Sequence, residues 1–265
     1  MKIIDGKLLS EAIRKKIANE VKQYSRPPGL AVILVGDDES SKVYVRNKSK
    51  ACVQVGFYSD QIHKSANITQ EELLSEVQRL NKNNNIDGIL VQLPLPSHID
   101  ANEIIEAIIP EKDVDGFSSE NVGKLSLNKP FISPCTPRGV MKMLDSIKCD
   151  LKGKDCVIIG ASNIVGRPMA MELLNAGGTV QVCHKGTKDI KFKTKSADII
   201  VAAAGVANLV NSEWVKEGAV IIDVGINRLD DGTITGDVDF EDVKDMVSAI
   251  TPVPGGVGPM TIAVL

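Results

Sequence analysis

Short runs rich in aliphatic residues recur along this chain, and segments of helical length separate them. The runs cover residues 30–35, 88–92, 156–159, 179–183, 197–203 and 219–224. A strand that is apolar at nearly every position buries both faces, as strands do in a parallel sheet covered by helices. Strands that alternate with helices build βαβ units. The sequence therefore predicts an α/β protein with parallel sheets.

Hydrophobic residues recur at three- and four-residue intervals between these runs, which predicts helices over residues 7–24, 42–55, 70–82, 139–147 and 164–175. Thr69 is the expected N-cap of the third helix, and Thr136 followed by Pro137 has the sequence of a helix start. The second half reads as strand, glycine-containing turn, helix and strand, which is typical of a dinucleotide-binding topology. With 265 residues, the chain fits two α/β domains.

The composition excludes several classes of partner. The net charge of −3 gives no field that would attract nucleic acid or anionic lipid. No apolar run approaches the roughly 18 residues of a membrane span. The five cysteines stand singly, which indicates a reducing compartment, and the three histidines lie in no zinc-like spacing. We expect a cytoplasmic protein that binds a small molecule, uses no metal and binds neither nucleic acid nor a membrane.

The sharpest local signal lies between a buried strand and a helix, at residues 160–166, Gly-Ala-Ser-Asn-Ile-Val-Gly. Glycines there let backbone N–H groups approach a pyrophosphate. Ser162 stands where the second glycine usually does, so a plain turn in which Ser162 or Asn163 caps the helix is the alternative. The next strand ends at Cys183-His184-Lys185, and a cation without a carboxylate favours NADP over NAD.

Four polar side chains of the first half are candidates for chemistry. Tyr44 and Lys48 are four residues apart and share one face of a predicted helix, although most such pairs only face solvent. Gln92 ends a buried strand before Leu93-Pro-Leu-Pro96, so its amide is expected at the carboxyl edge of the sheet, where α/β proteins bind ligands. Asp115 lies in an acidic segment, Asp-Val-Asp-Gly, that is otherwise a plain turn.

Seven blocks together resemble the bifunctional methylenetetrahydrofolate dehydrogenase/methenyltetrahydrofolate cyclohydrolase family, in order and over nearly the whole chain. They are Tyr44-Val-Arg-Asn-Lys48, Val91-Gln-Leu-Pro-Leu-Pro96, Lys112-Asp-Val-Asp-Gly116, Pro134-Cys-Thr-Pro137, Gly160-Ala-Ser162, Asp223-Val-Gly-Ile-Asn227 and Pro254-Gly-Gly-Val-Gly-Pro-Met-Thr261. The resemblance implies a folate-binding α/β domain over residues 1–136, to which 250–265 return, and a Rossmann-type domain over 137–249 that binds NADP, with NAD possible. It also implies a cleft between the domains and a homodimer formed through the cofactor domains.

The resemblance further implies an oxidoreductase and hydrolase of one-carbon metabolism that serves purine biosynthesis. Lys48 would be the catalytic base or proton shuttle, with Tyr44 stacked on the folate, Gln92 orienting the lysine and Asp115 binding the pterin. The substrate-binding residues would be Tyr44, Val91, Gln92, Leu93, Asp115, Pro254, Gly255 and Gly258. The cofactor-binding residues would be Gly160, Ala161, Ser162, Lys185 and Ile226.

Two cofactor positions depart from the family pattern, because many members have arginine at position 161 and serine at position 185. Here they are Ala161 and Lys185, so either the charge that binds the 2′-phosphate has moved to Lys185 or specificity has relaxed toward NAD. Two alternatives to the bifunctional enzyme remain at this stage. One is a dehydrogenase without the hydrolase step, and the other is a folate- or nucleotide-binding protein without catalysis.

Overall fold

The computed structural model describes residues 1–265, and the chain divides into two compact units. The three-strand unit consists of residues 11–133 and Leu265. The six-strand unit consists of residues 1–10 and 134–264. Both units are built on parallel sheets with helices, so the predicted two-domain α/β class is confirmed.

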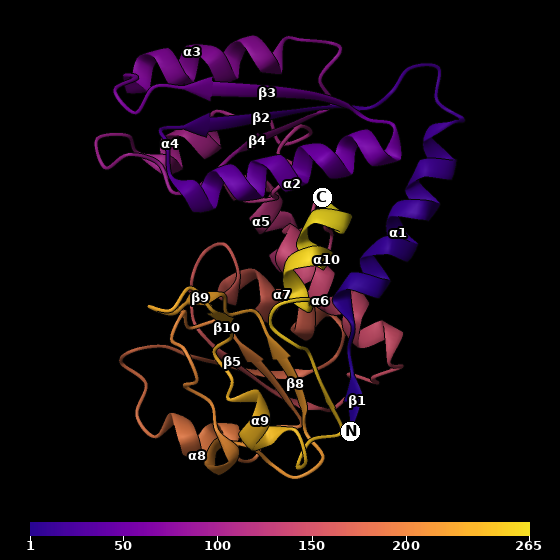
Figure 1. Ribbon diagram of the computed structural model, residues 1–265, viewed down its shortest axis with the longest axis vertical. Coiled ribbons are helices and arrows are strands. Elements are labelled where there is room, and N and C mark those ends of the chain that lie inside the picture. The colour runs from indigo at the N-terminus through magenta and orange to yellow at the C-terminus, as the bar shows by residue number, and fades with distance from the viewer. The chain divides into compact units, whose positions relative to one another are not determined.

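The three-strand unit has helices on both faces of its sheet (Figure 1). The central strand β2 (Gly29–Val35) pairs in parallel with β3 (Tyr58–Lys64) and with β4 (Gly88–Val91). The helices are α2 (Glu39–Val55), α3 (Gln70–Asn81), α4 (Ala101–Glu106) and α5 (Ser119–Ser126).

Alternate residues of β2 enter two different cores. On one face, Ile33 packs in a cluster with Leu73 of α3 and Ile104 of α4. On the other face, Val32 packs with Val45 of α2. Since both faces of β2 are covered, every residue of this strand is buried, which explains why its sequence shows no polar alternation.

The six-strand unit is a parallel sheet with the strand order β1-β11-β8-β7-β5-β6. In that order the strands are β1 (Lys2–Ile3), β11 (Ala249–Ile250), β8 (Val220–Asp223), β7 (Ile199–Ala202), β5 (Asp155–Ile159) and β6 (Thr179–Cys183). The helices are α6 (Cys135–Ser146), α7 (Gly166–Asn175), α8 (Ile190–Thr194), α9 (Phe240–Val243) and α10 (Val257–Val264), with a 3₁₀ turn at Ser212–Trp214. A small hairpin joins β9 (Asn227–Arg228) to β10 (Ile234–Thr235).

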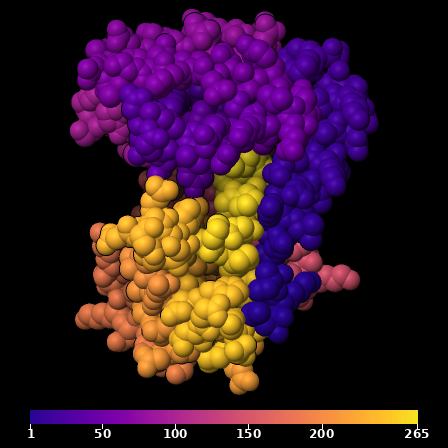
Figure 2. Space-filling model, in the orientation of Figure 1, coloured from indigo at the N-terminus to yellow at the C-terminus, as the bar shows by residue number.

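The first residues of the chain form part of the six-strand unit. Strand β1 pairs in parallel with β11, and Figure 2 shows these N-terminal residues, in indigo, beside the yellow C-terminal segment. Helix α1 (Gly6–Val21) follows. A Cβ on Gly6 would lie 1.8 Å from the carbonyl oxygen of Gly256, so only glycine allows this close approach. The sequence pattern did not predict this pairing.

Most predicted elements are present within a few residues of their expected bounds, and Thr69 caps α3 in a complete capping box. The start predicted for the helix after residue 136 is wrong by two residues. Helix α6 begins at Cys135 after Pro134, with no side-chain cap, and Thr136 Oγ1 instead lies 3.0 Å from Thr261 Oγ1.

The C-terminal segment differs from the expectation that residues 250–265 return to the first domain. Residues 250–264 belong to the six-strand unit, and only Leu265 groups with the three-strand unit. Helix α10 packs on α6, where a Cβ on Gly139 would lie 3.3 Å from Met260 Cβ. The absence of a side chain at Gly139 therefore lets the two helices approach closely.

Candidate active site

Lys48 lies on α2, and its side chain is nearly buried. Asp38 caps this helix by accepting a hydrogen bond from the Ser41 amide, and Lys48 follows about two turns later with 8% of its surface exposed. Its Nζ donates to Gln92 Oε1 at 3.1 Å. The sequence separates these two residues by 44 positions, and the fold brings them together.

Gln92 directly follows β4, and its own side chain is fixed. Its Nε2 donates to the Leu93 carbonyl oxygen at 2.8 Å, which leaves Oε1 directed at the lysine. Val91 is the buried last residue of the strand, and Leu93 is partly exposed beyond it. The amide therefore projects from the carboxyl edge of the sheet, as the sequence predicted.

Tyr44 lies one helical turn before Lys48 and therefore on the same flank of α2. Its side chain is partly buried, and burial raises the pKa of the phenol. The hydroxyl consequently remains protonated at neutral pH. Of the candidate site residues predicted from the sequence, Tyr44 is the only one with an aromatic side chain.

Asp115 is the second titratable group near Lys48. Burial raises the pKa of the Asp115 carboxyl to about 6, while the charge of Lys48 lowers it and that of Asp113 raises it further. A carboxyl with this pKa is mostly ionised at neutral pH and becomes neutral in mildly acidic solution. The charge of Lys48 therefore favours the ionised form of the Asp115 carboxyl.

Asp113 is a supporting residue that the sequence did not separate from Asp115. It is 2% exposed and accepts hydrogen bonds from the Gly116 amide at 3.0 Å, the Ser118 amide at 2.8 Å and Asn121 Nδ2 at 3.0 Å. These bonds fix the turn that contains Asp115. The two acids of the Asp-Val-Asp-Gly segment thus have different roles, and only their side-chain orientations distinguish them.

In the six-strand unit, the turn after β5 has the geometry of a nucleotide-binding loop. Gly160 has a φ of 127°, and a Cβ there would lie 2.1 Å from the Ala203 carbonyl oxygen. A Cβ on Gly166 would lie 2.1 Å from the Gly160 carbonyl oxygen. Both positions therefore need glycine for close backbone packing at the start of α7.

Ser162 lies in the turn before α7, whose N-cap residue is Val165 and which has no side-chain cap. Its Oγ accepts hydrogen bonds from the amides of Val165, at 3.2 Å, and Gly166, at 3.4 Å. Ala161 lies beside it, and its carbonyl oxygen accepts a bond of 3.3 Å from Arg167 Nε. The N-cap of α7 is thus Val165 rather than Ser162 or Asn163, although the Ser162 hydroxyl accepts a hydrogen bond from the first amide of the helix.

Lys185 and Ile226 lie on exposed turns of the same unit. Lys185 follows β6 in a turn where the His184 amide donates to Thr187 Oγ1 at 2.9 Å. Lys185 itself forms no ion pair, so its ammonium is available to an anion. Ile226 is 50% exposed, and its Cδ1 would lie 3.7 Å from a Cβ on Gly258.

The loop before α10 contains the three remaining predicted residues. Pro254 is exposed, Gly255 has a φ of 106°, and Gly258 lies in the first turn of the helix. All three belong to the six-strand unit, whereas Tyr44, Lys48, Gln92 and Asp115 belong to the three-strand unit.

Comparisons with known proteins match both halves of the chain to one family. The family described as tetrahydrofolate dehydrogenase/cyclohydrolase, catalytic domain, matches residues 4–115, and its NAD(P)-binding domain matches residues 134–265. The chain belongs to the tetrahydrofolate dehydrogenase/cyclohydrolase family. Bifunctional protein FolD of Ruthia magnifica is 60% identical over 265 residues, which cover all of this chain and 96% of that protein.

Two solved structures of the tetrahydrofolate dehydrogenase/cyclohydrolase family are also similar to this chain. The bifunctional FolD enzyme from Campylobacter jejuni has a TM-score of 0.98 and 55% identity, covering 100% of this chain and 95% of that one. The Trypanosoma brucei FolD, complexed with NADP and an inhibitor, has a TM-score of 0.95 and 40% identity, covering 99% and 93%.

Membership of this family makes the chain a bifunctional enzyme of tetrahydrofolate one-carbon metabolism, with NAD(P)-dependent methylenetetrahydrofolate dehydrogenase and methenyltetrahydrofolate cyclohydrolase activities. The readings as a dehydrogenase alone or as a binding protein without catalysis are therefore set aside. No cluster of three or more histidine, cysteine or carboxylate side chains is placed to hold a metal ion, and no helix is long and apolar enough to cross a membrane.

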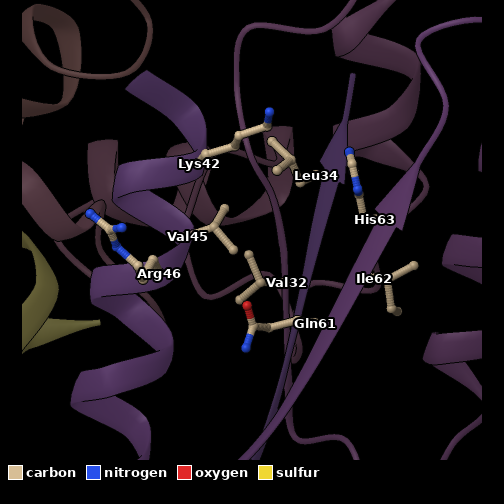
Figure 3. Close-up of a pocket in the computed structure, with 8 residues that line it drawn as sticks. All are labelled: Val32, Leu34, Lys42, Val45, Arg46, Gln61, Ile62 and His63. Atoms are coloured by element: carbon tan, nitrogen blue, oxygen red, sulfur yellow. The ribbon is translucent and has the colours of Figure 1, made fainter. Parts of the chain in front are cut away.

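This member of the dehydrogenase/cyclohydrolase family also has a pocket of about 260 Å³ on the other flank of α2 (Figure 3). Its lining includes Lys42 and Arg46 from the helix and His63 from β3. Lys42 is neutralised by ion pairs with Asp37 at 3.1 Å and Glu39 at 3.0 Å. The lining contains neither Lys48 nor Gln92, and Arg46 forms no ion pair there.

Proposed function

We propose that Lys48 is the proton acceptor of the cyclohydrolase step and that Gln92 holds it in place. The hydrogen bond of 3.1 Å between Lys48 Nζ and Gln92 Oε1 is the observation that carries this proposal. An amide oxygen accepts this bond without adding a negative charge that would favour the protonated ammonium. The neutral amine of lysine is the form that takes a proton.

The folate is proposed to lie with its aminobenzoyl ring on Tyr44 and its pterin at Asp115. When bound, NADP supplies the acceptor for the hydride of the methylene carbon. Oxidation leaves a methenyl cation on the folate, and the face of the Tyr44 ring suits a flat cation. Water then adds to the methenyl carbon and Lys48 takes a proton from it. The hydroxyl on that carbon then gives up its proton as the C=O bond forms, and the bond from the carbon to N5 breaks as N5 takes up a proton, which leaves 10-formyltetrahydrofolate.

The remaining folate contacts are proposed from two places in the sequence. Val91 and Leu93 flank Gln92 at the end of β4. Pro254, Gly255 and Gly258 lie in the loop and first turn of α10, where glycines leave the backbone open to a ligand. Backbone groups in such a loop suit the amide and amino groups of a pterin.

Replacing Lys48 with methionine tests the catalytic assignment. Methionine keeps the length and apolar stem of lysine but has no basic group, so hydrolysis of methenyltetrahydrofolate should fall to the buffer rate while folate still binds. The decay of methenyl absorbance measures hydrolysis, and calorimetric titration measures binding. Lys50→Met, on the exposed side of the same helix, is the matched control. Undiminished hydrolysis in Lys48→Met would refute the role.

We also propose that the enzyme prefers NADP over NAD and that Lys185 binds the 2′-phosphate. The proposal is supported by the free ammonium of Lys185 at the end of β6 and by the glycine turn at Gly160, with Ala161, Ser162 and Ile226 as further contacts. Lys185→Asp should reduce kcat/KM with NADP about tenfold or more, since a charged contact contributes about 1.5–3 kcal/mol, and should spare NAD. Equal kinetics with both cofactors before and after the change would contradict this. Lys188→Asp is the control for a lost surface charge.

We also propose the oligomeric state, the location and the metabolic role of the enzyme. The enzyme is a homodimer formed through the six-strand unit, whose edge strand β6 leaves Val182 37% exposed. It works in the cytoplasm, since all five cysteines are free thiols. Its formyl product serves purine biosynthesis. Light scattering tests the first point, because a mass equal to one chain at micromolar concentration would contradict it.

A further inference from the structure

Two buried carboxylates lie behind the carboxyl edge of the six-stranded sheet. Asp223 is the last residue of β8 and is 3% exposed, and Asp237 follows the β9–β10 hairpin and is fully buried. Neither forms an ion pair with a basic side chain. Buried carboxylates without a cation need other hydrogen-bond donors, and here backbone amides supply almost all of them.

Asp237 accepts hydrogen bonds from three consecutive amides of the loop after β7. Its Oδ2 accepts from Ala204 at 2.6 Å and Gly205 at 2.9 Å, and its Oδ1 accepts from Val206 at 3.0 Å. Oδ1 also accepts from Asn227 Nδ2 at 2.9 Å. One side chain thus fixes the loop of residues 204–206 and the start of β9.

Asp223 performs the same task for the neighbouring segments. Its Oδ1 accepts from the Gly225 amide at 2.9 Å and the Asp237 amide at 3.0 Å, and its Oδ2 accepts from Val238 at 2.9 Å. The Asp223 amide donates in turn to Thr251 Oγ1 at 2.7 Å. The two carboxylates are therefore linked through the backbone of residue 237.

Two glycines are required by this arrangement. A Cβ on Gly236 would lie 1.8 Å from Asp223 Oδ2, and a Cβ on Gly225 would lie 2.2 Å from Asp237 Oδ1. Any side chain at either position would displace a carboxylate from its donors. Gly236 therefore leaves room for the Asp223 carboxylate, and Gly225 leaves room for the Asp237 carboxylate.

The segments held in this way are exposed surface. Residues 204–206 and Ile226 are exposed, although Asp237 behind them is fully buried. The same loop begins at Ala203, whose carbonyl oxygen would lie 2.1 Å from a Cβ on Gly160. The glycine turn, the 204–206 loop and the Ile226 turn are thus connected parts of one edge.

We propose that Asp237, supported by Asp223, is a positioning residue of the dinucleotide site, because it sets the loop of residues 204–206 and the turn that presents Ile226. The inference rests on the proposed binding of NADP at this edge. Asp237 itself is covered by the loops and touches no ligand. Its contribution is a preformed surface, which spares the cofactor the entropic cost of ordering two loops.

Asp237→Asn tests the proposal with little change in volume. An amide has only one acceptor oxygen, and each carboxylate oxygen of Asp237 accepts two of the four bonds, so either orientation of the new amide loses two of them. Amide hydrogen exchange in the apo enzyme should show faster exchange at residues 204–206. Binding of NADPH, followed by its fluorescence, should weaken about tenfold or more, which corresponds to about 1.4 kcal/mol.

Asp239→Asn is the matched control, because it removes one negative charge two residues away. Asp239 caps α9, and asparagine caps a helix equally well. If Asp237→Asn does not fold, Asn227→Ala removes a single donor to Asp237 and should weaken NADPH binding by a smaller factor. In each folded variant, hydrolysis of methenyltetrahydrofolate, a step that consumes no dinucleotide, should remain at the wild-type rate.

The outcomes separate this inference from the proposed function. If the loop exchanges faster in Asp237→Asn but NADPH binds as in the wild type, the positioning role is refuted and the cofactor site stands. If exchange at residues 204–206 is unchanged, the anchoring itself is refuted. If wild-type enzyme binds no NADPH, the proposed cofactor assignment fails first.

Discussion

Gln92→Glu would place a carboxylate where the amide oxygen now accepts the hydrogen bond of Lys48. The Nζ–Oε1 distance is 3.1 Å. At an effective dielectric constant of about 20, two unit charges at that distance attract by about 5 kcal/mol. Desolvation of the new carboxylate offsets several kcal/mol of this attraction. We expect a net stabilisation of the protonated ammonium by about 1–3 kcal/mol.

This stabilisation removes the neutral amine that the hydrolysis requires. Because each 1.4 kcal/mol is a factor of ten, hydrolysis at neutral pH should fall about 10- to 100-fold. The rate should recover in alkaline solution, so the pH profile should move upward by about 1–2 pH units. The assay is the decay of methenyl absorbance across a pH series, corrected for the buffer rate at each pH.

Gln92→Met is the control for this substitution. Both variants lose the bond that Gln92 Nε2 donates to the Leu93 carbonyl oxygen, but only glutamate adds a charge. The methionine variant should hydrolyse more slowly without any alkaline displacement of its profile. If the profile of Gln92→Glu has the same pH position as that of the wild type, the electrostatic reasoning about Lys48 is wrong.

Three further changes have expected outcomes. Asp115→Asn should stabilise the fold at pH 7 by about 1–3 kcal/mol. Burial raises the pKa of the Asp115 carboxyl in the folded protein from 3.8 to about 6, so this carboxyl ionises at lower pH in the unfolded chain. The wild-type protein therefore loses stability as the pH rises from 3.8 to about 6, and asparagine avoids this loss. Melting curves at pH 3.5 and pH 7 check this, and an equal effect at both pH values would contradict it. Gly160→Ala should abolish the fluorescence enhancement of bound NADPH while hydrolysis continues, since the new Cβ would lie 2.1 Å from the Ala203 carbonyl oxygen. NADPH binding at the wild-type affinity would contradict the requirement for glycine at this position. Thr69→Ala should cost about 1 kcal/mol in urea unfolding, because it opens the capping box with Glu72, and Ser75→Ala, on the exposed side of the same helix, should cost less.

Elements with strong local signals could be predicted from the sequence. Helix α3 combines a capping box with a regular apolar face, and β2 is apolar throughout. Strand β3 (Tyr58–Lys64) could not be found in this way, because it lies at one edge of the sheet and, unlike β4 at the other edge, its residues are mostly polar and none is fully buried. Strand β1 is only two residues long and pairs with a segment almost 250 positions away, so no local pattern reveals it.

The site residues likewise differ in how far a local sequence pattern could identify them. The position of Gln92 at a strand end and of Lys48 on a helix face suggested two candidates, but their hydrogen bond depends on how helix and sheet pack. Asp113 and Asp115 are indistinguishable in sequence, and only the donors around Asp113 identify it as structural. No sequence pattern identified Asp237, because three of its four hydrogen-bond donors are backbone amides, which are present in every sequence.

The pairing of β1 with β11 affects the order in which the polypeptide acquires its structure during synthesis. Residues 11–133 form a continuous segment and have all their strand partners once that segment is made. Lys2 and Ile3, although translated first, wait for Ala249 and Ile250 before their strand can form. A truncation of the first five residues would therefore damage the nucleotide half of the enzyme, which is encoded at the opposite end of the message.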